Sequence, residues 1–285
     1  MFLNKIKIEN NLILYKNDYK ISDIEKVLKS GKARGIRIYC PFENDCKRIE
    51  NLTFLQEISD LEEISILCNK PISFEFLYNI KTLKSLKIQT IFSDLDLEKL
   101  SDRLELLSIN YNEFVINFGT LNKLKKLHIE FSKYQNIDFN SLNSLLHLSI
   151  DGLKTNNLEL LRHLKALKSL RISNANNIHS LQDIVSLQNL EFIEFNNCKQ
   201  LNNIENLSSL KNLKILELID NNSIKSNFNF LKELKNIKQF SLINSKKNLI
   251  VDNENFNGIE RVIINKYKNY SRGRLSFWNW SDWMW

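Results

Sequence analysis

Apolar residues recur along this chain in a short pattern with a fixed period. The pattern is L-x-x-L-x-L, with Ile or Phe at some leucine positions. Its ten clear copies end at Ile66, Ile88, Ile109, Ile129, Ile150, Ile172, Phe195, Leu218, Leu242 and Ile264. These ends span 198 residues in nine steps, which is an average period of 22 residues. Because side chains alternate across a strand, each L-x-L predicts a short strand with one apolar face.

A second apolar pattern fills the segments between these strands. From Asn177 to Leu218, an apolar residue stands at almost every third position. This spacing predicts a return segment of 3₁₀-like or extended backbone after each strand. No single repeat can bury its own apolar face, so neighbouring repeats must stack and their strands must line up in one parallel sheet.

With these motifs the chain resembles a leucine-rich-repeat protein, closest to the bacterial internalin-like type with 22-residue repeats. The resemblance implies an α/β solenoid, a right-handed horseshoe with a parallel concave sheet of about 10–12 short strands and a 3₁₀ or extended convex side. The family usually has Asn three residues after the last strand leucine. Asn112, Cys198 and Asn221 occupy that position here, but other residue types replace Asn in most repeats. We therefore expect an irregular solenoid, especially at residues 70–170, with some turns held by other means.

The two ends of the solenoid need covers, because an open stack exposes its terminal core. We predict three parts: an N-terminal cap at 1–50, the repeats at 51–265 and an aromatic C-terminal cap or tail at 266–285. In the N-terminal cap, NLILYK is extended, a helix covers about 22–30 with Ser22 as its N-cap, and strands end at Ile8 and Ile38. The last part contains Trp278, Trp280, Trp283 and Trp285, which either cover the last repeat or dock a partner.

Composition changes this picture little. The chain has a formal net charge of +7, but its Lys residues are spread along its length, so nucleic-acid binding is not indicated. Polar residues interrupt the apolar runs of the first 20 residues, and 18 apolar residues never follow one another. We therefore expect a cytoplasmic protein without a secretion signal or a membrane span. Cys40, Cys46, Cys68 and Cys198 lack metal-binding spacing and are expected to be reduced.

The strand positions that flank the core leucines predict a binding surface on the concave face. Carboxylates are neighbours there, Glu130 beside Asp151 and Glu194 beside Glu217, with apolar side chains among them. The predicted protein-binding residues are Tyr111, His128, Glu130, Phe131, Asp151, Arg171, Phe192, Glu194, Ile215, Glu217 and Ile219. An acidic surface with aromatic anchors would suit a basic protein partner. The alternative is an ordinary polar solenoid surface on which these acidic pairs occur by accident.

Catalytic motifs do not occur in the sequence. It has no Gly-rich phosphate loop, H-E-x-x-H, G-x-S-x-G or kinase pattern. His128 and His147 could approach Glu130 and Asp151, but nothing sets the geometry of metal ligands, so we expect solvated side chains there. We predict no enzyme activity, no cofactor, no metal and no small-molecule substrate.

Three functions are compatible with this sequence. The first is an immunity protein that binds and neutralises a cognate toxin, because the degenerate repeats resemble leucine-rich-repeat immunity proteins of bacterial toxin systems. Charge reversal at Glu194 and Glu217 should then weaken the complex. The second is a general scaffold or regulatory subunit, like the phosphatase-regulating members of the family. The third, nucleic-acid binding through Lys-rich loops, would show steep salt dependence.

Overall fold

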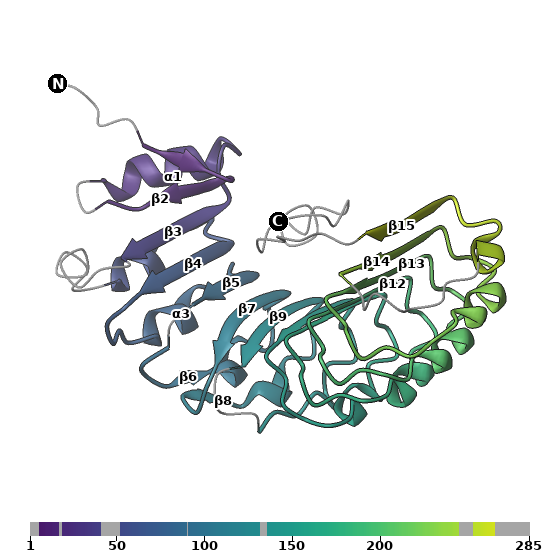
Figure 1. Cartoon of the computed structure of the whole chain (residues 1–285). Helices are drawn as coiled ribbons and strands as arrows, with labels where there is room; N and C mark the ends of the chain where they lie inside the picture. Colours follow the sequence, from purple (N-terminus) through teal and green to yellow (C-terminus); the bar gives the residue numbers. More distant parts are fainter. Residues whose placement is uncertain are drawn as a thin grey trace. The chain divides into compact units, whose positions relative to one another are not determined.

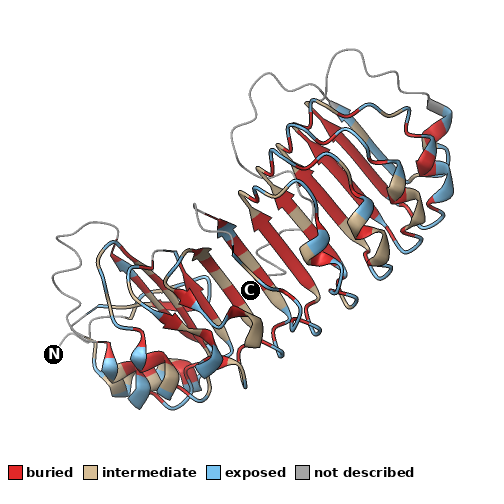
Figure 2. Ribbon diagram, turned by 90° about the horizontal axis from the view of Figure 1, so that it is seen from below, coloured by how far each residue is buried: buried red, intermediate tan, exposed pale blue. Residues whose placement is uncertain are grey.

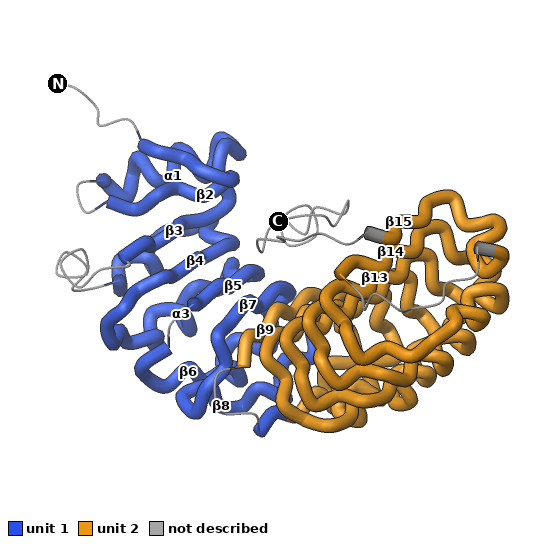
Figure 3. Tube along the Cα trace, viewed as in Figure 1, with its two compact units in different colours: residues 1–124, 132–137 blue, residues 125–131, 138–285 orange. Residues whose placement is uncertain are grey.

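The computed structural model describes residues 6–16, 19–40, 52–89, 91–131, 136–244 and 253–265. The chain divides into two compact units, which Figure 3 shows in different colours. Unit 1 comprises residues 1–124 and 132–137, and unit 2 comprises residues 125–131 and 138–285. Each unit is built from repeats of a strand and a return segment, as the period of the sequence predicts.

Unit 1 contains a main sheet in the order β1-β2-β3-β4-β5-β7, together with a separate pair of parallel strands, β6 and β8. In the main sheet β1 and β2 are antiparallel, and the later pairs are parallel. The elements of unit 1 are β1 (Ile8–Glu9), β2 (Leu12–Leu14), α1 (Ile21–Lys29), β3 (Gly35–Cys40), η1 (Thr53–Glu57), β4 (Glu63–Cys68), α3 (Glu75–Asn79), β5 (Ser85–Ile88), β6 (Leu95–Asp96), η2 (Leu97–Leu100), β7 (Leu106–Tyr111), β8 (Val115–Ile116) and η3 (Phe118–Thr120), where η marks a 3₁₀ helix.

Unit 2 is the more regular of the two, and its strands are all parallel in the order β9-β10-β11-β12-β13-β14-β15. Figure 1 shows the strands side by side and the short helices of successive repeats on the opposite side of the unit. Its elements are β9 (Lys126–Phe131), β10 (His147–Asp151), η4 (Glu159–Leu161), β11 (Ser169–Ser173), η5 (Gln182–Ser186), β12 (Phe192–Asn196), η6 (Glu205–Ser209), β13 (Ile215–Ile219), η7 (Asn229–Glu233), β14 (Gln239–Ile243), η8 (Asn253–Phe256) and β15 (Arg261–Asn265).

The core lies between the strands and the return segments and consists of the residues that the two apolar patterns predict. Ile193 and Phe195 of β12 point into it and are fully buried, as are Ile184 and Leu187 of the preceding return. Figure 2 shows buried residues concentrated along the strands. Each repeat is covered by the repeats before and after it, which is why the pattern must persist over the whole stack.

The turns after the strands of unit 2 share a left-handed residue that the sequence analysis did not identify. The residue directly after each of β10 to β14 has a positive φ, between 54° and 78°: Gly152, Asn174, Asn197, Asp220 and Asn244. Gly, Asn and Asp adopt this conformation at the least steric cost. The backbone N–H of Asn174 donates to Asn196 O at the end of the next strand, and Asn197 and Asp220 repeat this contact. Most of the turns that lack the family asparagine therefore have a left-handed residue of this column.

The family asparagines themselves act as expected. Asn221 is buried; its Nδ2 donates to Phe195 O at 2.7 Å, and its Oδ1 accepts from Cys198 N at 2.9 Å. Asn112 donates in the same way to Ile91 O at 2.8 Å. In both repeats a side-chain amide therefore satisfies a backbone group of the preceding repeat.

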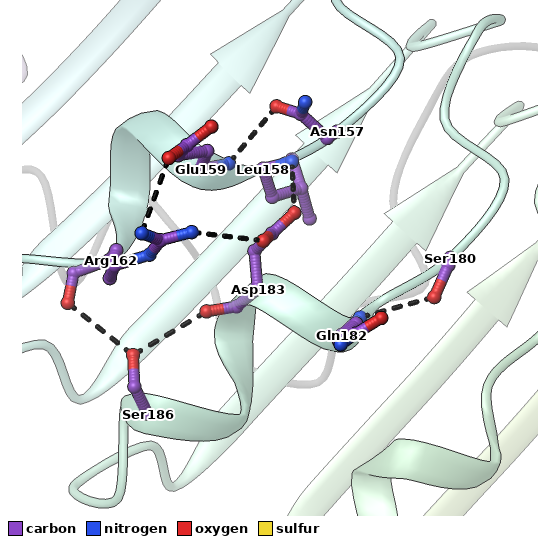
Figure 4. Close-up of polar contacts among 8 residues, drawn as sticks. All are labelled: Asn157, Leu158, Glu159, Arg162, Ser180, Gln182, Asp183 and Ser186. Carbon is purple, nitrogen blue, oxygen red and sulfur yellow. Dashed lines mark hydrogen bonds and ion pairs between the residues drawn. The ribbon is translucent and has the colours of Figure 1, made fainter.

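Polar contacts on the side opposite the sheet tie successive return segments together (Figure 4). Asp183 of η5 accepts a hydrogen bond from Leu158 N at 3.0 Å and lies 3.7 Å from Nη2 of Arg162. Ser186 Oγ donates to Arg162 O at 3.3 Å. Amides of Asn189, Asn212 and Asn236 likewise donate to carbonyls of the preceding repeat at 2.8 to 2.9 Å.

The N-terminal helix differs in one respect from the prediction. Helix α1 begins at Ile21, so Ser22 lies inside its first turn and is not the N-cap; Lys20 holds that position, without a side-chain capping bond. Glu25, expected to complete a capping box, instead accepts from the backbone N and the Oγ of Ser59 at 3.4 and 3.3 Å. A contact with the next repeat thus replaces the local cap. The strand predicted to end at Ile8 is misplaced, because β1 begins at Ile8 and ends at Glu9, whereas β3 contains Ile38 and continues to Cys40.

Candidate functional site

The candidate site is the face of the unit 2 sheet that points away from the core, called here the unit 2 sheet face. The register places three outward positions on each strand, and the neighbours form columns across the sheet. These columns run Lys126, His147, Ser169, Phe192, Ile215, Gln239 and Arg261; then His128, Ser149, Arg171, Glu194, Glu217, Ser241 and Ile263; then Glu130, Asp151, Ser173, Asn196, Ile219, Ile243 and Asn265. Nine of the predicted binding residues lie on this face.

Tyr111 and Phe131 do not lie on an outward face, and the prediction that they do is wrong. Tyr111 stands two positions after Ile109, and Phe131 two after Ile129, so both share the inward side of their strands. Both are buried. The hydroxyl of Tyr111 donates to Asn136 O at 2.7 Å, and its ring meets Phe118 edge-on. The alternation of strand side chains, applied strictly, excludes both residues from the sequence alone.

Exposure varies along the unit 2 sheet face. Glu130 is exposed, and His128, Asp151, Arg171 and Phe192 are half-buried. On β12 to β14, by contrast, most outward residues are buried, among them Glu194, Ile215, Glu217, Ile219, Ser241 and Ile243. The expectation that Glu194 and Glu217 are open acidic contacts is therefore wrong. Exposure of this kind depends on atoms remote in sequence, which local patterning does not reveal.

Glu194 on β12 is held by an ion pair with Arg171 of the preceding strand, β11. Its Oε2 lies 2.6 Å from Nη2 of Arg171. Burial raises the pKa of Glu194, and the Arg171 guanidinium opposes this rise by favouring the charged carboxylate. A buried pair of this kind is neutral in sum and offers little net charge to a partner.

Glu217, beside Glu194 in register, forms no such ion pair among the described residues, although the charges of Arg171 and Arg261 favour its charged form. Its Oε1 accepts a hydrogen bond from Gln239 Nε2 at 3.0 Å, and its Oε2 has no hydrogen-bond partner within the described part of the chain. Burial, followed by the charge of Glu194, raises the pKa of Glu217 to about 7. A buried carboxylate with one oxygen unbonded is unusual, because buried polar groups generally have hydrogen-bond partners.

The accessible charge of the face is concentrated on β9 and β10. Glu130 and Asp151 are register partners, and Asp151 Oδ1 also accepts from Asn174 Nδ2 at 2.8 Å. His128 Nδ1 lies 3.1 Å from Ser149 Oγ, and burial lowers its pKa. Burial, then Lys126 and Lys168, lowers the pKa of His147 to about 4. Both imidazoles are therefore neutral at pH 7, and the carboxylates set the sign of this region.

Unit 1 carries a charged cluster that the sequence analysis did not identify. The carboxylate of Glu63 on β4 is buried between two cations, with Arg34 Nε at 2.7 Å and Lys87 Nζ at 3.0 Å. Burial lowers the pKa of Lys87 to about 8, against the opposing charge of Glu63. Gly35 is opposite Glu63 in register, and a Cβ there would collide with the Glu63 carbonyl. The signal in the sequence that could have revealed this cluster is Glu63, a charged residue at the first position of a strand.

No group of three or more His, Cys, Asp or Glu side chains in the described part of the chain could hold a metal ion. No described helix is both long and apolar enough to traverse a lipid bilayer. Cys40, Cys68 and Cys198 are buried thiols. The four tryptophans and Cys46 lie outside the described residues.

Comparisons with solved structures decide the fold. An internalin from Listeria monocytogenes matches 86% of this chain and 72% of its own length, at 18% identity and a TM-score of 0.56. The chain has the leucine-rich-repeat fold. A Toll-like receptor solved with single-stranded RNA matches 86% of the chain at 19% identity and a TM-score of 0.54. Drosophila Toll, solved with Spatzle, matches 74% at 12% identity and a TM-score of 0.55.

The leucine-rich-repeat receptors are much longer than this chain, which spans 38% of the Toll-like receptor chain and 30% of the Toll chain. No protein-family model matches the sequence, and no curated protein matches it. The likeness therefore establishes the leucine-rich-repeat architecture, and the function must be argued from the residues of the site.

Proposed function

We propose that this leucine-rich-repeat chain is a non-enzymatic protein-binding module that holds a basic protein segment on the unit 2 sheet face. The observation that carries the proposal is the accessible carboxylate pair, Glu130 beside Asp151, on a face whose two histidines are neutral at pH 7. Elsewhere on this face Glu194 is paired with Arg171, Glu217 has a pKa of about 7, and Arg261 of β15 adds a positive charge, so the acidic part is β9 and β10, where Glu130 and Asp151 outnumber Lys126.

The recognition we propose combines charge and an aromatic contact. Glu130 and Asp151 attract Lys or Arg side chains, and half-buried Phe192 offers apolar area on the same face. Arg171 is committed to Glu194, so it does not cancel the charge of the exposed pair. Glu130 is exposed and Asp151 is half-buried, so this pair lies on an open sheet surface and not in an enclosed pocket, which supports binding and not a reaction.

In its specific form, the proposal is that the chain acts in the cytosol as an immunity protein and neutralises a cognate toxin by this contact. The acidic face suits a basic toxin segment, and the described cysteines are buried thiols, as is usual for proteins of a reducing compartment. A general scaffold or regulatory subunit would use the same face. It would bind its partner without rescuing toxin-poisoned cells.

The test is capture of the native partner from lysate with the full chain, followed by affinity measurements with variants. We expect the double variant Glu130→Lys/Asp151→Lys to bind on the order of tenfold or more weakly, since about 1.4 kcal/mol corresponds to a factor of ten. The control Glu57→Lys/Glu113→Lys makes the same charge change at exposed sites away from this face and should bind like wild type. Equal affinity of the double variant and its control would refute the site.

A further inference from the structure

A line of side-chain amides leads to Asp151, one of the two accessible carboxylates of the unit 2 sheet face. Asn174 Nδ2 donates to Asp151 Oδ1 at 2.8 Å, and Asn197 Nδ2 donates to Asn174 Oδ1 at 2.6 Å. The three side chains come from three successive repeats, and all are half-buried. Both amides therefore direct an N–H group toward the carboxylate, and the two hydrogen bonds polarise one another in the same sense.

The backbone holds both asparagines in place for these contacts. Asn174 and Asn197 have positive φ values of 55° and 54°, and their backbone N–H groups donate to carbonyls at the ends of the next strands at 2.9 and 2.8 Å. Glycine satisfies the same backbone conformation, as Gly152 does in the same column. The turn itself therefore does not require the Asn174 amide, whereas the hydrogen bond to Asp151 does. The Asp151 carboxylate is thus held in one position before a partner arrives.

Glu130 and Asp151 offer a cation two carboxylates in different surroundings. They are register partners on β9 and β10, so their backbones are about 4.8 Å apart. Glu130 is exposed, whereas Asp151 uses Oδ1 for the Asn174 bond, which leaves Oδ2 for a partner. A lysine ammonium has three donors and can bond one oxygen of each carboxylate. An arginine fork binds best to both oxygens of one carboxylate, and at Asp151 it would have to share Oδ1 with Asn174.

We propose that the Glu130–Asp151 pair takes a lysine side chain of the partner in preference to an arginine, and that Asn174 is the positioning residue behind this selection. Asn197 supports Asn174 from the next repeat. The inference rests on the proposed function, because it specifies the partner of the same site. It narrows the basic segment to one that presents lysine.

Fluorescence anisotropy of the full chain with two labelled synthetic peptides provides the test. One peptide alternates Lys with Ser and the other Arg with Ser, each around a central Leu. Wild type should bind the Lys peptide about three- to fivefold more tightly, within the range that exposed ion pairs contribute. Asn174→Gly keeps the left-handed backbone and removes the amide. It should bind the Lys peptide roughly three- to tenfold more weakly, because Asp151 is then ordered only on binding, and the preference for Lys should disappear.

Asn117→Gly is the matched control. Asn117 also has a positive φ, 57°, and its Nδ2 donates to Asp96 Oδ1 at 2.8 Å, but this contact belongs to unit 1 and not to the unit 2 sheet face. The variant should bind both peptides like wild type. A double-mutant cycle separates positioning from a general structural role. With Asp151→Asn in place, Asn174→Gly should cause no further loss of affinity for the Lys peptide.

Three results would overturn this inference: tighter binding of the Arg peptide by wild type, an unchanged Lys preference in Asn174→Gly, or an equal loss from Asn174→Gly with and without Asp151→Asn. The double variant Glu130→Lys/Asp151→Lys shows separately whether the proposed function fails. If this variant binds the Lys peptide more weakly than wild type does, the site stands and only the selection by Asn174 is wrong. Equal binding by this variant, or no binding of either peptide by wild type, would refute both.

Discussion

Arg171 and Glu194 form an ion pair of 2.6 Å across adjacent strands, and Glu217, the next residue in the same column, is left with one carboxylate oxygen unbonded. Three outward charges in consecutive repeats thus have different environments. The difference determines how each responds to protonation and to substitution, and it leads to the first prediction.

Glu217→Gln should stabilise the chain at pH 8 but not at pH 5. The folded chain raises the pKa of Glu217 from 4.5 to about 7, so it holds the proton more tightly than the unfolded chain does. The stability gained from this group is complete below pH 4.5 and is lost as the pH rises through 7. The loss has an upper bound of about 3 kcal/mol. Urea unfolding at both pH values measures it.

The matched control for this pH effect is Glu130→Gln, which removes an exposed carboxylate from the same face. A surface carboxylate contributes little to the free energy of unfolding. If Glu217→Gln and Glu130→Gln shift the unfolding midpoint equally at pH 8, the buried Glu217 carboxylate does not lower the free energy of unfolding, and the prediction is wrong.

Glu63→Gln should destabilise unit 1 strongly, by about 3–5 kcal/mol, because it removes the carboxylate that pairs with Arg34 and buried Lys87. Lys87→Met should cost much less, since the Glu63 carboxylate keeps Arg34 and an apolar side chain fits a buried site. Thermal unfolding of both variants at pH 7 tests this order. A larger loss in Lys87→Met than in Glu63→Gln would contradict it.

The pH dependence of Lys87→Met provides a second check on this cluster. Because folding lowers the pKa of Lys87 from 10.5 to about 8, the wild-type chain gains stability from this group as the pH rises from 8 to 10.5. The variant lacks this group, so the difference in unfolding free energy between the variant and wild type should change over that range. A constant difference would show that Lys87 titrates normally in the folded chain.

Asn221→Ala should lower the free energy of unfolding by at least about 2 kcal/mol, because Phe195 O and Cys198 N each lose a buried partner. Asn222→Ala is the matched control, since Asn222 is the next residue and is exposed. Chemical denaturation compares the two. Similar small losses in both variants would mean that water replaces the Asn221 amide without cost.

Much of the fold could be predicted from the sequence, because its main determinants are local. The 22-residue period identified the strands from β4 onward in chain order, apart from the separate pair β6 and β8, and the apolar residues at every third position identified the return segments. Asn112 and Asn221 were also identified correctly as turn residues. The left-handed column at Asn174, Asn197 and Asp220 was missed, although Asn and Asp directly after a strand were a visible signal.

The sequence by itself thus determined the repeat, the direction of the core and the composition of the outward columns, because a stacked repeat needs only its own apolar pattern and its neighbours. The tertiary structure alone decided which outward residues solvent can reach. Glu130 and Glu217 are both outward carboxylates in the sequence pattern, yet one is exposed and the other buried. The physical reason is that exposure is set by every atom within reach of a side chain, including atoms far away in sequence, whereas strand alternation sets only the direction in which the side chain points.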